Sequence, residues 1–132
     1  MTKHTAVLAA LLTAVLSVRP PDVTGEWAVT ATLAAAGASK GRRPQRIELV
    51  CTFEQHDAVL TGSCRPPSGP EGAPLKGVAN GTHIEWSFEI APDETAAKQP
   101  ARFRGTVAGD GSAMKGAIEF AGSRGGFRAR RR

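Results

Sequence analysis

Outside its first residues, the chain lacks any segment with the three-to-four-residue apolar repeat of an amphipathic helix. Without helices it cannot form the glycine-rich loop and helix N-terminus that cradle phosphate groups in nucleotide-binding folds. It has only 2 cysteines, Cys51 and Cys64, and their spacing is not that of a redox-active CxxC pair. These absences argue against nucleotide-dependent and thiol-redox enzymes and leave an all-β domain to be considered.

The chain also lacks an apolar run long enough to cross a membrane, which takes about 20 residues in a helix. Its one apolar run, from Ala6 to Leu16, follows a short basic start, as in secretory signal peptides. We therefore expect a signal peptide at 1–17, a linker at 18–22 and one domain at 23–132. The protein is then secreted or periplasmic and does not span a membrane. An uncleaved anchor or a buried first helix is the alternative.

Apolar and polar residues alternate along most of the remaining chain, which is typical of half-buried β-strands. The alternating segments are 26–33, 47–54, 60–64, 73–79, 84–90, 103–107, 114–120 and a last one around Phe127 and Ala129. Four of them repeat one phrase, in which a large apolar residue, a polar residue, a glycine and a small residue follow each other. The four copies are 60–63, 75–78, 103–106 and 114–117. We predict an eight-stranded antiparallel up-and-down barrel, because eight is a number at which a sheet closes.

Tight turns and longer loops alternate between these segments. Turns are expected at Asp57-Ala58, Asn80-Gly81 and 109–111, and longer loops at 34–45, 65–73, 91–100 and 121–125. Alternate connections of a meander lie at the same end of the barrel. The sequence therefore predicts one end with tight turns and one end rich in loops.

The two cysteines are expected to form a disulfide, because the chain is predicted to be exported. If Asp57 and Ala58 are the central turn residues, Cys51 and Cys64 are equally far from the turn and lie directly opposite each other. Such a bridge would contribute about 3 kcal/mol. Ala58 is the weak point of this register, because a glycine would better accept a positive φ there.

Gly25-Glu26-Trp27 at the start of the first strand, with an arginine cluster near the last, resembles the lipocalin and avidin (calycin-type) barrels. The chain also resembles small exported bacterial barrel domains of unassigned function. The resemblance implies that Gly25 and Trp27 lie at the closed end of the barrel, with Trp27 under Arg130 or Arg131. The chain is shorter than a full lipocalin, has no tyrosine and lacks the C-terminal helix, so no ligand-binding residue is carried over.

The loop-rich end is the candidate binding site, because loops on a rigid scaffold usually carry function. We expect a non-enzymatic barrel whose pocket for a small apolar or amphipathic ligand is lined by Trp86, Phe88, Phe103, Ile118 and Phe120. Positive charges gather around this mouth, namely Arg42, Arg43, Arg46, Arg65 and Arg124, and favour a ligand with an acidic group. The alternative is that these side chains simply fill a solid barrel.

A net charge of +5 with four arginines in the last five residues also predicts a basic C-terminal tail. A solid barrel with such a tail would be a structural or interaction module that contacts an anionic envelope component or a partner protein. An exported protein rarely meets nucleic acid, so none is expected as a partner.

No cofactor, metal or catalytic residue is expected. His56 and His83 lie near Asp57 and Asp110 at the tight-turn end, but turn residues are usually only exposed and polar. Ser63 and Ser112 lack convincing histidine and carboxylate partners for nucleophilic chemistry.

Overall fold

The alternating segments of the sequence form eight β-strands in the computed structural model, which describes residues 21–34, 44–69, 72–91 and 95–132. The predicted signal peptide and most of the predicted linker lie outside the described residues. The strands are β1 (Gly25–Leu33), β2 (Gln45–His56), β3 (Val59–Arg65), β4 (Ala73–Asn80), β5 (His83–Ile90), β6 (Gln99–Val107), β7 (Ala113–Phe120) and β8 (Ser123–Arg131). The described residues include no helix long and apolar enough to cross a bilayer.

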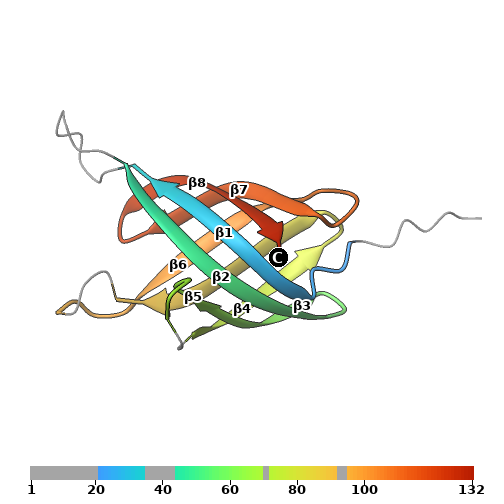
Figure 1. The fold of residues 1–132 in the computed structure, drawn as a ribbon, viewed down its shortest axis with the longest axis horizontal. Helices are drawn as coiled ribbons and strands as arrows, with labels where there is room; N and C mark the ends of the chain where they lie inside the picture. Colours follow the sequence, from blue (N-terminus) through green and yellow to red (C-terminus); the bar gives the residue numbers. More distant parts are fainter. Residues whose placement is uncertain (1–20, 35–43, 70–71, 92–94) are drawn as a thin grey trace, which may run out of the picture.

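Each strand pairs antiparallel with its neighbour in the sequence, and β8 pairs back with β1 to close the barrel (Figure 1). The predicted all-β class, strand number and up-and-down order are therefore confirmed. The β2–β3, β4–β5 and β6–β7 turns lie at the right-hand end in Figure 1, together with the start of β1. The opposite end carries the β1–β2, β3–β4 and β5–β6 loops and the β7–β8 turn.

The register confirms the disulfide and the Asp57-Ala58 turn, and it corrects the turn between β4 and β5. Cys51 pairs directly with Cys64 and is bonded to it. In the turn beside them, Asp57 and not Ala58 takes the positive φ, so alanine is no obstacle there. Asn80 pairs with His83, which makes Gly81-Thr82 the central turn residues.

The predicted 121–125 loop is wrong, because β8 already begins at Ser123. Phe120 pairs with Ser123 across a tight turn in which Ala121 and Gly122 both have positive φ. Two left-handed residues in succession form the two-residue turn that matches strand twist. The loop-rich end therefore has three longer connections and one tight turn.

Inward-facing side chains fill the barrel with one apolar core. It runs from Val23 and Trp27 at the tight-turn end to Leu33, Leu49 and Phe88 near the other end. Among the described residues, no polar or charged residue is buried. The large apolar residues of the four repeated phrases, Leu60, Leu75, Phe103 and Met114, are all part of this core.

The repeated glycines allow close approach of neighbouring strands. Gly105 pairs with Gly116 between β6 and β7. A Cβ at Gly105 would lie 2.1 Å from the Lys115 carbonyl oxygen, and a Cβ at Gly116 would lie 2.1 Å from that of Arg104. No side chain fits at such a distance, so these glycines let a small barrel coil sharply and do not open a pocket.

Candidate functional site

The tight-turn end of the barrel is sealed by Trp27 and Arg131. Trp27 is fully buried, and its indole Nε1 donates a hydrogen bond to the Val23 carbonyl oxygen at 2.9 Å. The Arg131 guanidinium carbon lies 4.7 Å from the centre of the Trp27 ring. A cation over an aromatic face is attracted by the ring quadrupole. This is the arrangement that the calycin resemblance implies.

The arginine over Trp27 is Arg131 and not Arg130. Arg130 pairs with Ala28 and is exposed on the outer wall, because successive residues of a strand face opposite sides. Arg128, Arg130 and Arg131 all belong to β8. Most of the predicted basic tail is therefore a strand of the barrel wall.

Arg131 also holds the segment that leads into β1. Its Nε donates to the Gly111 carbonyl oxygen and its Nη1 to that of Thr24, both at 2.8 Å, while its Nη2 donates to that of Asp22. The Asp22 carboxylate accepts a hydrogen bond from the Thr24 amide at 2.8 Å. Hydrogen bonds from the Thr24 backbone and hydroxyl, with the positive charge of Arg131, hold the pKa of Asp22 below its ordinary value.

The middle of the barrel is filled by aromatic rings. Trp86 is stacked with Phe53 at 5.4 Å between ring centres and meets Phe103 edge-on at 3.8 Å, and Phe127 lies at 5.3 Å. Phe88 and Ile118 are buried in the same core. Four of the five predicted pocket residues thus pack against one another. Among the described residues, the Trp86 indole nitrogen is the buried side-chain polar atom without a hydrogen-bond partner.

The fifth predicted pocket residue, Phe120, belongs to a partly exposed ring at the loop-rich end. Ile47, Ala73, Ile90 and Phe120 are inward-facing apolar residues that pack against the core but are only partly buried. They come from β2, β4, β5 and β7, at the end of each strand that lies next to the loops. We call these four residues the loop-end rim. The barrel thus has one sealed end and one apolar end that solvent reaches.

The predicted mouth charges are partly neutralised by partners. Arg46 forms an ion pair with Glu48 at 3.1 Å, and Arg124 forms one with Glu119 at 3.3 Å. The Arg65 guanidinium donates a long hydrogen bond of 3.5 Å to the Pro67 carbonyl oxygen. Arg42 and Arg43 lie outside the described residues. Of the described mouth arginines, Arg46 and Arg124 therefore each face a neighbouring carboxylate that the sequence analysis did not count.

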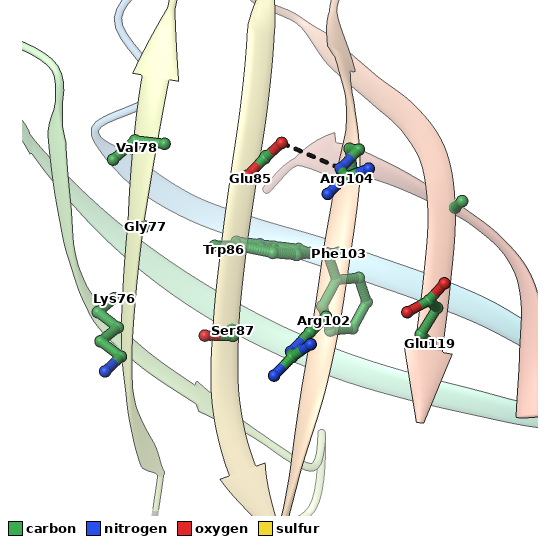
Figure 2. A pocket seen from close by; sticks show the side chains of 11 residues that line it. Lys76, Gly77, Val78, Glu85, Trp86, Ser87, Arg102, Phe103, Arg104 and Glu119 are labelled. Carbon is green, nitrogen blue, oxygen red and sulfur yellow. Dashed lines mark ion pairs between the residues drawn. The ribbon is translucent and has the colours of Figure 1, made fainter. Parts of the chain in front are cut away.

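The outer wall has hollows that the sequence pattern did not reveal. One of about 570 Å³ lies over β4–β7, where the small Ser87 separates Lys76 from Arg102 (Figure 2). Arg104 forms an ion pair with Glu85 across it at 3.0 Å. Val78 lines this hollow with 51% of its surface exposed and pairs with Val59, which is 54% exposed. The signal for such hollows, a small residue between long ones on adjacent strands, appears only once the register is known.

Ser112 and the candidate metal ligands lie in or next to the turns at the sealed end of the barrel. Within the described ranges, no group of three or more histidine, cysteine, aspartate or glutamate side chains is placed to hold a metal. Ser112 donates its hydroxyl to the Asp110 carboxylate at 2.6 Å, inside one turn. Hydrogen bonds from the Ser112 side chain and backbone lower the pKa of Asp110, which explains this shift without a catalytic role.

No protein-family model matches the chain, and no curated protein matches it either. The closed eight-stranded barrel is compatible with a calycin-like fold. Membership of the lipocalins or avidins stays a prediction from the residues that carry the resemblance.

Proposed function

We propose that this barrel is an exported, non-enzymatic, calycin-like binding module whose loop-end rim holds the apolar part of a small amphipathic ligand. The proposal is supported by the difference between the two ends of the barrel. Trp27 and Arg131 seal one end, whereas the rim presents inward apolar side chains to solvent at the other. The mouths of β-barrels are preferred places for small-molecule sites, which are lined mostly by apolar side chains.

The ligand contacts the rim and does not enter the middle of the barrel. The stacked rings around Trp86 occupy that space, so only the layer formed by the rim and the adjacent core is accessible. Polar groups around the rim, including Arg65, would meet the hydrophilic part of the ligand. The disulfide is consistent with an extracellular or periplasmic location, as proposed.

Decanoate tests this function, because it combines an acyl chain with one carboxylate. We expect the methyl NMR signals of Ile47 and Ile90 to shift with decanoate and those of core Ile84 to stay unchanged. Phe120→Ser and Ile90→Ser should each weaken binding, because they remove apolar surface from the rim. Val78→Ser, which removes an exposed apolar side chain from the outer wall, is the matched control. Equal weakening in Val78→Ser, or no saturable shift at the rim, would refute the proposal.

The filled interior favours a second function, that of an interaction module. In this proposal, the basic residues of the outer wall contact an anionic envelope component or a partner protein. The supporting observation is that Arg128 and Arg130 lie exposed on β8, in a fixed position on the barrel.

A further inference from the structure

Four polar residues form one row across the outer wall where β6, β7, β8 and β1 lie side by side (Figure 1). Thr106 pairs with Lys115, Lys115 pairs with Arg128, and Arg128 pairs with Thr30. Directly paired residues have neighbouring side chains on the same face of a sheet. The row therefore places two cations next to each other, with a hydroxyl on either side.

The two cations of this row have no compensating carboxylate among the described residues. Glu48, which pairs with Thr30, is engaged by Arg46 at 3.1 Å. The other nearby carboxylates are also engaged, since Glu119 is 3.3 Å from Arg124 and Glu26 is 2.6 Å from Arg132. Like charges directly opposite each other destabilise a sheet. An anion bound between Lys115 and Arg128 would remove this repulsion.

The surface at this row is hollowed. A depression of about 620 Å³ is lined by Lys115, Arg128 and Thr30, and Gly126, on the same outward face as Arg128, has no side chain to fill it. The long cationic side chains therefore stand beside open space. Their donors, the guanidinium fork of Arg128 and the ammonium of Lys115, match the several acceptor oxygens of one phosphate group, and a threonine hydroxyl stands beside each of them.

We propose that Thr30, Thr106, Lys115 and Arg128 form a binding site for a phosphate group. The inference rests on the second proposed function, to which it gives a defined site, and it is independent of ligand binding at the rim. Arg128 binds two phosphate oxygens through its fork, and Lys115 adds a point charge. Thr106 and Thr30 flank this pair three strand spacings apart, so one phosphate meets one of the two hydroxyls. Free phosphate and a phospholipid headgroup offer the same chemistry.

Inorganic phosphate is the first probe, with sodium chloride at equal ionic strength as its reference. We expect saturable amide NMR shifts at Thr30, Thr106, Lys115 and Arg128 with phosphate and not with chloride. Lys115→Gln and Arg128→Gln should each weaken phosphate binding roughly three- to fivefold, the effect of one exposed charge pair. Arg102→Gln, an exposed cation of the other hollow, should leave it unchanged. Equal amide shifts with chloride, or an equal loss of phosphate binding in Arg102→Gln, would refute the proposed site.

Vesicles containing phosphatidylglycerol distinguish the source of the phosphate group. If the site takes a lipid headgroup, Lys115→Gln and Arg128→Gln reduce vesicle binding while Arg102→Gln does not. If it takes free phosphate, the amide shifts appear and vesicles are not bound. Vesicle binding that is equal in all variants, with no phosphate shifts, would refute this site and leave the broader interaction function standing.

Discussion

Arg131 connects β8 to two other parts of the chain, the segment 22–27 and the turn at Gly111. It donates hydrogen bonds to carbonyl oxygens of Asp22, Thr24 and Gly111, and its guanidinium covers the Trp27 ring. A lysine could supply the charge over the ring but not the planar fork that meets carbonyls in several directions. The closure of this end therefore depends on the contacts of Arg131 itself and not on the number of positive charges in β8.

Replacement of Arg131 by alanine should lower the free energy of unfolding by about 2 kcal/mol, through lost charge-assisted hydrogen bonds and the lost contact with Trp27. Arg130→Ala, the matched control on the outward face, should change it by no more than about 0.5 kcal/mol. Urea unfolding followed by tryptophan fluorescence measures both. Similar losses in the two variants would contradict the role assigned to Arg131.

At the scale of the strands, alternation and turn chemistry predict most of the fold. Period-two patterns identify all eight strands, and equal spacing from one turn predicts the disulfide. The pattern fails for Val50, which alternation assigns to the outer face but which is buried in the structure. It also fails at 121–125, because residues small enough for a loop can equally continue a strand, as Gly125 and Gly126 do in β8.

Neighbouring glycines of β8 provide a sharp test of close strand approach. A Cβ at Gly125 would lie 1.7 Å from the Thr32 carbonyl oxygen, whereas the nearest atom to a Cβ at Gly126 is 3.6 Å away. Gly125→Ala should therefore cost about 3 kcal/mol by overpacking. Gly126→Ala should cost nothing or gain up to about 1 kcal/mol, because alanine loses less freedom on folding. Thermal and denaturant unfolding of the two variants measures these changes in stability. Equal stability of the two variants would argue against the close approach of β1 and β8.

The candidate sites are less predictable than the strands. Alternation shows that Trp86 and Phe103 face inward, but whether facing rings leave a cavity depends on their packing across the barrel. Ion pairs such as Arg124–Glu119 follow from cross-strand register. The row from Thr106 to Thr30 joins residues far apart in the sequence, so it emerges only when the barrel closes.

At the scale of the whole molecule, the disulfide links β2 and β3, with the bonded cysteines 13 positions apart in the sequence. Reduction should lower the free energy of unfolding by about 3 kcal/mol, because the unfolded chain regains the freedom of that loop. Guanidinium unfolding with and without a reducing agent measures this change. The folded barrel should persist after reduction, since the core is shared by all eight strands. An unchanged midpoint would show that the bridge does not contribute to stability.

The pairing of β1 with β8 has a consequence for the order in which the protein folds. Trp27 and Arg131 meet only after the other six strands have been synthesised, so barrel closure involves the most distant strands in the sequence. Contacts of such long range slow folding. Until they form, the edges of the open sheet, β1 and the last strand then present, can pair with other chains. We therefore infer that a nascent chain is most prone to aggregation just before its final strand is available, when seven strands form an open sheet.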